Sequence, residues 1–513
     1  MPSIRRFIPG PSANRSAVTI PFAAIVLAML PAVLDQTILA TALPVIAGDL
    51  GRVTDVSWVV TAYVVAAAAT TPLWGKLGDR HGRKRMLEVA LTIFLLASAL
   101  CGAAQDITQL TVVRLVQGAA AGGLMTLAMA AVGDLVAPRQ RGRYQGYIAA
   151  AFAVATVVGP LVGGVLVQHA SWRWVFFVNL PLGAVALAGL GLRLPAPASE
   201  RPERPLDAAG AGLLAGATSA FMLVCIWGGQ RYGWGSAPIL ALITATVILA
   251  GMLLMRERRA ADPIVPFHLL RTRAVAVASA ALFLATAALF SITVFVPLFL
   301  ETTTGATPTE AGLLLVPAML GITISTTLSG RAMVRTGRYK RFPIAGLALM
   351  TAGLGLLAVL SGDPSKVATG VGVAVFGLGF GMVTQILVVA VQNGVEQREL
   401  GVATATTSFF RGLGGAVGAA VLGAVFAAQA GSGASEASGR GLHGIPTADI
   451  GTGAQTVFAV AAPLAALALL VVLALPESPL RTTTGPRPGA PEERRPAKAR
   501  LGPTLRGRLE GES

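Results

Sequence analysis

Apolar residues along this chain form long runs without charge, and the short segments between the runs hold most of the charged residues. Runs of about 20 residues match the length that an α-helix needs to cross the hydrocarbon core of a bilayer. The apolar positions show no strand-like alternation over ten-residue units, and a bilayer admits little besides helices and closed barrels. The pattern therefore predicts an all-α polytopic membrane protein. The fourteen predicted spans cover residues 18–44, 55–75, 86–105, 108–135, 143–168, 172–193, 207–229, 236–255, 274–300, 309–329, 342–361, 367–392, 401–429 and 453–475.

Composition agrees with this class, since 54% of the residues are hydrophobic and the mean hydropathy is +0.70. The net charge of +16 would suit nucleic-acid binding only if the basic residues shared one surface. Instead, 33 of the 40 Lys and Arg residues lie in the termini and in alternate connectors, all on one side of the predicted spans. By the positive-inside tendency, we expect both termini to be cytoplasmic and the protein to lie in the cytoplasmic membrane. The opposite connectors hold only Arg52, Arg173, Arg231, Lys366 and Arg440.

One basic connector, GKLGDRHGRKR at residues 75–85, is unusually rich in charge. A role in setting topology explains its basic residues, but it does not explain Asp79 or the three glycines, which permit a tight turn or a close backbone approach. The pattern recurs 255 residues later as GRAMVRTGR, residues 330–338. The matched positions are Gly75/Gly330, Lys76/Arg331, Arg80/Arg335, Gly82/Gly337 and Arg83/Arg338.

A duplicated connector predicts a duplicated bundle, with a ligand site between the two halves near the middle of the membrane. We expect a cytoplasmic N-terminus at 1–17 and six-helix bundles at 18–195 and 272–476. A two-helix insertion is expected at 205–257. The tail at 477–513 is rich in Pro, Arg and Gly, which predicts disorder.

The sequence G-x-L-x-D-R-x-G-R-K at residues 75–84 resembles the signature between spans 2 and 3 of the major facilitator superfamily. Other segments resemble motifs of its fourteen-span drug:proton antiporters, the EmrB/QacA type, in spans 1, 4, 5, 6 and 13. These segments are LDQTILATALPVI (34–46), RLVQGAAAGG (114–123), GPLVGG (159–164), WRWVFFVNLPLG (172–183) and FFRGLGGAVG (409–418). The resemblance covers nearly all of residues 18–475. Two departures are Val334, where the first connector has Asp79, and Ala155, where the antiporter motif has Gly.

The resemblance implies the major facilitator fold with 14 transmembrane helices in a 6 + 2 + 6 arrangement. It also implies a proton-coupled antiporter that exports small lipophilic compounds, such as drugs, antibiotics or secondary metabolites, by alternating access. We expect the substrate, protons and membrane lipid as partners of a monomer, with no cofactor, metal ion or nucleic acid. Cys101 and Cys225 both fall within predicted spans and suggest no disulfide or metal framework.

Two other functions stay open. One is a proton-coupled importer of a small metabolite on the same fold, against which the GPLVGG motif argues. The other is a non-transporting membrane enzyme or receptor. No phosphate-binding loop and no set of nucleophile, base and acid is visible, and the four His residues lie in connectors or at span ends. We therefore expect that the protein is not an enzyme.

Asp35 and Arg114 are charged residues deep in predicted spans, where charge is costly and indicates function. At 1.5 Å per residue, Asp35 lies about 13 Å and Arg114 about 9 Å from the outer ends of spans 1 and 4. Burial favours the neutral form of a carboxyl group and a nearby guanidinium favours the charged form. We predict that Asp35 carries the coupled proton and that Arg114 sets its affinity. The alternative is a fixed structural ion pair between the two spans.

The charged connector is predicted to hold a gate latch, a cytoplasmic charge cluster of Asp79, Arg83 and Asp134 that closes the inner side when the carrier faces outward. The resemblance implies a comparable cluster in the family. The alternative is a connector that only sets topology. The latch is predicted to comprise Gly75, Asp79, Arg80, Gly82, Arg83 and Asp134.

The antiporter motif consists of Gly159, Pro160, Gly163 and Gly164. We expect its glycines to leave one helix face without side chains for a close neighbour, and Pro160 to bend the helix. Ordinary small-residue packing is the alternative to a role in exchange, which the family resemblance favours.

A substrate cavity is predicted from residues that suit a lipophilic ligand, although aromatic residues at such positions also face lipid or serve packing. Span 10 lacks an interior carboxylate and span 13 carries a cation, so neutral, zwitterionic or anionic substrates are favoured over multiply charged cations. The assigned cavity residues are Gln117, Tyr63, Phe290, Phe409 and Arg411.

Overall fold

The structure is a computed structural model in which the arrangement of most of the chain is described. The described residues are 15–50, 53–194, 206–229, 231–260, 262–264, 267–360, 365–429 and 447–480. Within them, fourteen helical stretches are long and apolar enough to cross a membrane, as the hydropathy pattern predicts.

The helices of the first part of the chain are α1 (Arg15–Leu50), α2 (Val53–His81), α3 (Arg83–Gly102), α4 (Ile107–Leu135), α5 (Pro138–His169), α6 (Trp174–Phe177) and α7 (Asn179–Arg193). Next come α8 (Ala208–Trp227), α9 (Ala237–Glu257) and α10 (Phe267–Arg271). The last part contains α11 (Arg273–Phe290), the π-helix η1 (Ser291–Phe295), α12 (Val296–Thr303), α13 (Pro308–Leu313), α14 (Val316–Thr336), α15 (Arg341–Leu360), α16 (Lys366–Gly394), the 3₁₀ turn η2 (Gln397–Glu399), α17 (Leu400–Gln429) and α19 (Thr447–Leu473).

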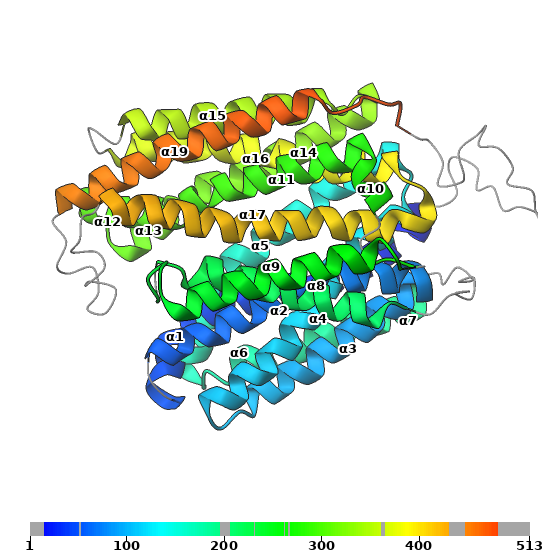
Figure 1. Ribbon diagram of the computed structural model, residues 1–513, viewed down its shortest axis with the longest axis horizontal. Helices are drawn as coiled ribbons and strands as arrows, with labels where there is room; N and C mark the ends of the chain where they lie inside the picture. The colour runs from blue at the N-terminus through cyan, green and yellow to red at the C-terminus, as the bar shows by residue number, and fades with distance from the viewer. Residues whose placement is uncertain are drawn as a thin grey trace, which may run out of the picture.

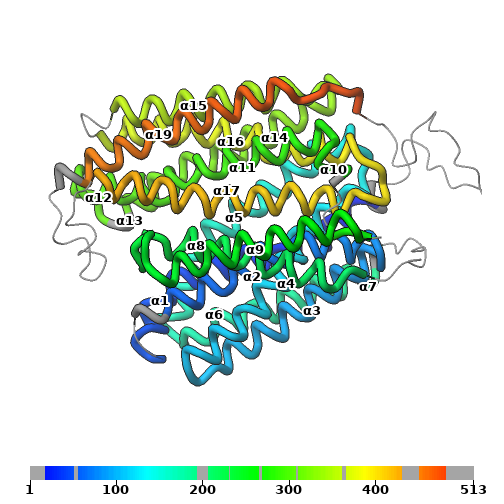
Figure 2. Tube along the Cα trace, in the orientation of Figure 1, coloured from blue at the N-terminus to red at the C-terminus, as the bar shows by residue number. Residues whose placement is uncertain are grey.

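The long helices run roughly parallel to one another along the longest axis of the molecule (Figure 2). Helices α1–α4, α6 and α7 lie in the lower part of Figure 1 and α11–α19 in the upper part, with α5 in the middle, where it packs on both α1 and α14. Helices α8 and α9 lie in front between the two parts. Helix α17 packs on α2 and α4 as well as on α11 and α19, so it forms part of the seam between the two groups.

The charged connector at residues 75–85, which the sequence places between two predicted spans, is almost entirely helical and continues both of them. Helix α2 continues to His81 and α3 begins at Arg83, so Gly82 alone makes the corner. Its backbone φ of 90° lies in a region that residues other than glycine rarely adopt. Because the connector is helical, its charged side chains are held by rigid elements rather than by a mobile loop. We call this end of the molecule the Gly82 end.

Close glycine contacts recur in the two groups of helices. A Cβ atom added at Gly118 of α4 would overlap the backbone of Tyr63 in α2. A Cβ atom at Gly377 of α16 would overlap the backbone of Ala318 in α14 in the same way. Small residues let helix backbones approach closely, so the duplicated sequence has a duplicated packing contact.

The antiporter motif makes a second such contact. Gly159 and Gly163 of α5 meet Thr37, Ile38 and Thr41 of α1, as expected for a helix face without side chains. Gly164 does not share that contact, because one residue of an α-helix turns the side-chain direction by about 100° and nothing lies within 4 Å of its added Cβ. The corresponding contact in the last part of the chain places Gly414 and Gly418 of α17 against α11.

The repeated connectors lie at the two places where the groups meet. Gly75 of α2 lies against Gly401 and Ala405 of α17. Gly330 of α14, its match in the sequence, lies against Gly142 of α5. Both glycines therefore permit a close approach of two helix backbones, which is one of the two uses predicted for the connector glycines; the other is a tight turn.

Residues 477–480, at the start of the predicted tail, lie against the bundle. Ser478 donates its backbone N–H to the Tyr339 hydroxyl at 3.2 Å, and Asn393 donates to the Pro479 carbonyl at 3.3 Å. Leu480 is buried. The predicted N-terminal segment up to residue 14 and the rest of the tail, 481–513, lie outside the described residues.

Candidate functional site

Asp35 and Arg114 meet inside the first group of helices, as the sequence predicts. Asp35 of α1 is 0% exposed and Arg114 of α4 is 1% exposed. Arg114 Nη1 donates to Asp35 Oδ2 at 2.5 Å. A charge-assisted hydrogen bond of this kind is among the stronger polar contacts, and burial withdraws both charges from water.

The guanidinium of Arg114 is held from several other directions. It donates from Nη1 to Gln117 Oε1 at 2.8 Å and from Nε to the Val59 carbonyl at 3.3 Å. Its carbon Cζ lies 4.1 Å from the centre of the Tyr63 ring, and the Tyr63 hydroxyl donates to the Ala32 carbonyl at 3.3 Å. Gln117 and Tyr63, which the sequence analysis assigned to a substrate cavity, are thus both buried parts of the Asp35 cluster.

The other oxygen of Asp35 accepts two hydrogen bonds from amide side chains. Gln117 Nε2 donates at 2.9 Å and Asn179 Nδ2 at 3.3 Å. These three described partners, Arg114 included, all donate, so the cluster is arranged for an ionised carboxylate.

Asn179 is a residue that sequence reasoning missed. It is 0% exposed, stands at the break between α6 and α7, and also donates to Ser98 Oγ at 3.1 Å. The available signal was its place in the motif WRWVFFVNLPLG, but an uncharged residue 144 positions from Asp35 has no local pattern that links it to the carboxylate.

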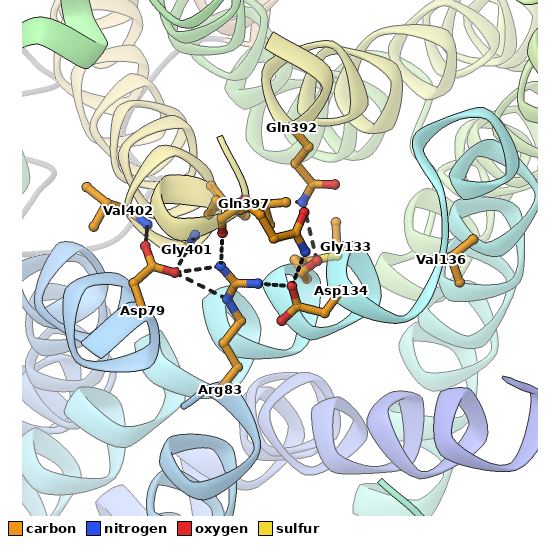
Figure 3. A network of polar contacts seen from close by, with 12 residues as sticks. Asp79, Arg83, Gly133, Asp134, Val136, Gln392, Gln397, Gly401 and Val402 are labelled. Carbon is orange, nitrogen blue, oxygen red and sulfur yellow. Dashed lines mark hydrogen bonds and ion pairs between the residues drawn. The ribbon is translucent and has the colours of Figure 1, made fainter. Parts of the chain in front are cut away.

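The predicted gate latch assembles at the Gly82 end (Figure 3). Arg83 Nη2 donates to Asp79 Oδ1 at 2.6 Å, and a second nitrogen of Arg83 forms an ion pair with Asp134 at the end of α4. Arg80, which was assigned to the latch, instead lies 3.4 Å from Asp262 in the connector after α9, and Lys76 also pairs with Asp262.

The latch also crosses the seam, through partners on η2 and α17 that the sequence analysis did not name. Asp79 accepts from the backbone N–H groups of Gly401 at 2.9 Å and Val402 at 2.8 Å. These groups belong to the first turn of α17, where the unpaired N–H groups and the helix dipole favour a negative charge. Arg83 donates to the carbonyl of Gln397 at 2.9 Å, and the Gln397 side chain donates to Asp134.

A second link across the seam joins Arg141 to Gln392. Arg141 of α5 is 1% exposed and donates from Nη1 to Gln392 Oε1 of α16 at 3.1 Å. Gln392 in turn donates to the Met129 carbonyl and to Thr404 Oγ1. In the sequence, Arg141 is one of several basic residues of a connector, and nothing local predicts its burial, because that burial depends on the packing of α5 against the other group.

The remaining predicted cavity residues do not come together. Phe290 packs against Phe295, with ring centres 6.2 Å apart. Phe409 lies beside Phe410 on α17 and lines a cavity against α8 and α9. Arg411 is half-buried on the same helix. In the described part of the chain, no three His, Cys, Asp or Glu residues are placed to hold a metal ion.

In the described part of the chain, fourteen membrane-length helices pack with repeated contacts in its first and last parts, which is the architecture of a polytopic membrane transporter. The chain belongs to the Major Facilitator Superfamily, whose family model matches residues 25–419.

Several known proteins are similar to this chain in sequence. An uncharacterized MFS-type transporter of Mycobacterium tuberculosis is 38% identical over 81% of this chain, which spans 61% of the length of that relative. The multidrug transporter protein MdtP of Bacillus subtilis is 34% identical over 82% of this chain and 77% of its own length. The efflux pump dotC of Dothistroma septosporum is 33% identical over 78% of this chain and 70% of its own length.

Solved structures confirm the fold. The human organic anion transporter MFSD10 has a TM-score of 0.64 at 17% identity and covers 89% of this chain and 99% of its own. The proton:xylose symporter XylE has a TM-score of 0.65 at 14% identity and covers 92% of this chain and 98% of its own.

Proposed function

We propose that this chain is a proton-coupled antiporter that exports small lipophilic compounds by alternating access. The observation that carries the proposal is the fully buried pair of Asp35 and Arg114. A buried ion pair is a costly way to join two helices, and ionisable residues inside membrane helices default to functional roles. Relatives named as a multidrug transporter and as an efflux pump support export rather than import.

The geometry suggests how a proton changes the bundle. When Asp35 accepts a proton, its attraction for Arg114 weakens, while the guanidinium keeps its contacts to Gln117 and Val59. The ion pair that joins α4 to α1 then loosens. The hydrogen bond from Asn179 of α7 to the same carboxyl group changes at the same time. A proton that binds two conformations with different affinity shifts the balance between them.

We also propose the topology that the charge pattern favours. The Gly82 end and both termini would be cytoplasmic, in the cytoplasmic membrane, because the basic residues are concentrated on that side. The six-helix halves would be 18–195 and 272–476, joined by the insertion at 205–257. The gate latch would then lie on the cytoplasmic side, where its contacts across the seam would hold that side closed.

The proposed substrates are neutral, zwitterionic or anionic lipophilic molecules, handled by a monomer. Arg411 on α17 is the charged residue assigned to the substrate path in the second half. Strong export of a divalent cation, with no export of any neutral, zwitterionic or anionic compound, would contradict this part of the proposal.

A vesicle assay separates the open alternatives. Everted membrane vesicles with an acidic interior should accumulate a radiolabelled zwitterionic fluoroquinolone, and a proton ionophore should abolish the accumulation. An importer would accumulate its substrate only in right-side-out vesicles, and an enzyme or receptor would accumulate nothing in either. Vesicles from cells without the protein serve as the control.

A further inference from the structure

A cavity of about 360 Å³ lies between the α8–α9 hairpin and the seam formed by α2 and α17. Its walls come from all four helices and include Pro72 of α2, Thr218 of α8, Ala250 of α9, and Thr406 and Phe410 of α17. The volume is within the range of about 300–1,000 Å³ typical of small-molecule sites. The cavity is separate from the Asp35 cluster and from the gate latch.

The chemistry of the walls is almost wholly apolar. The hydroxyl groups of Thr246 and Thr406 donate to carbonyls of their own helices, at 2.7 Å and 2.8 Å, and therefore add little polarity to the space. An apolar cavity of this kind stays dry and binds apolar molecules rather than water. Phe409 and Phe410 add aromatic surface on the α17 side.

One wall of the cavity is a largely exposed helix, which in a membrane would face lipid. Helix α9 is one of the most exposed helices, and both Ala250 and Leu254 line the cavity while remaining exposed. A lipophilic molecule dissolved in the bilayer can therefore enter without crossing water.

The lining of the cavity offers no partner for an anionic group. Glu257, at the end of α9, is the acidic residue of the lining; it is 5% exposed and accepts a hydrogen bond from the Ile264 N–H at 3.1 Å. Among the described residues that line the cavity there is no Lys or Arg to pair with a phospholipid phosphate. A neutral small molecule needs no such cation.

The position of the cavity also matters, because its walls include both sides of the seam. Pro72 lies three residues before Gly75, and Thr406 follows Ala405, the residue that Gly75 contacts. A molecule in the cavity therefore touches both helices that must separate when the Gly82 end opens.

We propose that this cavity, between the two-helix insertion and the α2–α17 seam, is a binding site for a neutral, drug-sized lipophilic molecule that enters from the membrane. The site does not depend on the direction or coupling of transport. A binding experiment alone tests the site. The site can therefore be absent while the proposed function holds, and the proposed function can be wrong while the site exists.

The probe is the neutral photoreactive compound 3-trifluoromethyl-3-(m-[¹²⁵I]iodophenyl)diazirine, applied to the purified full-length protein in lipid nanodiscs. We expect labelling of peptides from α8 and α17 that an excess of the unlabelled compound reduces at least fivefold. Ala250→Trp fills the cavity from an exposed helix and should abolish this displaceable labelling. Val247→Trp is the matched control, because Val247 lies on the same helix, is exposed and does not line the cavity.

Ala217→Leu fills the same space from α8 and gives a second test if Ala250→Trp does not yield folded protein. Loss of displaceable labelling in either folded variant, with labelling kept in Val247→Trp, supports the site. Labelling that excess compound cannot displace, or that is equal in the filled variants and the control, would mean that bulk lipid occupies the space and would overturn the proposal.

Discussion

The two oxygens of the Asp35 carboxylate accept hydrogen bonds from side chains of α4 and α7. The effect of substituting one of these donors therefore depends on which hydrogen bonds to Asp35 it removes. The pairing of Asp35 with Arg114 was predictable, because charged residues are rare in the spans and these two lie at compatible depths. The contribution of Asn179 was not predictable, because it depends on the break between α6 and α7.

Asn179→Ala removes one donor to the ionised carboxylate and should move the pH of half-maximal transport upward. The amide of Asn179 donates to the charged form of the carboxyl group, so its loss favours proton binding and moves the transport profile toward higher pH. The measurement is the pH profile of substrate uptake into proteoliposomes.

Ser98→Ala is the control for Asn179→Ala, because it removes the other partner of Asn179 and leaves the contacts of Asp35 in place. An unchanged profile in Asn179→Ala, or an equal shift in both variants, would show that Asn179 does not act on the coupling carboxylate.

Asp79→Asn should reduce turnover at normal surface expression. The substitution removes the charge that Arg83 and the first turn of α17 share, so closure of the Gly82 end loses stabilisation. Arg80→Gln is the matched control, because Arg80 pairs with Asp262 outside the cluster. Turnover of Asp79→Asn equal to that of the native protein would remove the latch hypothesis.

At the scale of helices, packing is set by glycines at a few positions rather than by all glycines of a motif. Gly159→Val should lower the melting temperature, because the added side chain overlaps Thr37 and overpacking costs about 1–3 kcal/mol. Gly164→Val, in the same motif, has open space around it and should melt within a degree of the native protein. A similar loss of stability in both variants would indicate a general effect of valine on α5.

The N-terminus of α8 depends on Asp207. Its carboxylate caps the helix by accepting from the Gly210 N–H at 2.9 Å and pairs with Arg256 of α9 at 3.0 Å. The hydrogen bond from Arg256, followed by that from Gly210, holds the pKa of Asp207 below its usual value of 3.8. The ionised form is therefore favoured by folding, so its stabilisation is present above about pH 4 and is lost as the pH falls further.

Asp207→Ala should cost about 1 kcal/mol, the usual effect of losing a helix cap, and the loss should be visible as a lower melting temperature at pH 7. The difference from the native protein should shrink as the pH is lowered below 4. A difference that stays constant down to pH 3 would show that the charge of Asp207 contributes nothing.

At the scale of the whole molecule, the number of spans could be predicted from the sequence, because a bilayer imposes length and hydropathy on every helix. The family could be predicted from the motifs of the first connector and of the spans. The duplication was visible in the two connectors because the glycines at Gly75 and Gly330 serve matching contacts. The partners across the seam, such as Gln397 for Arg83 and Gln392 for Arg141, were not predictable. They are neutral residues whose pairing follows from how the two groups of helices meet.

The central claim, that the buried Asp35 carries the coupled proton, is tested most directly with purified protein in proteoliposomes under an imposed pH gradient. The native protein should concentrate a zwitterionic substrate against its gradient. Asp35→Asn protein should reconstitute normally and bind substrate in a manner that no longer responds to pH, yet should fail to concentrate the substrate. If Asp35→Asn protein still concentrates substrate under the pH gradient, the proton is carried elsewhere and the claim is wrong.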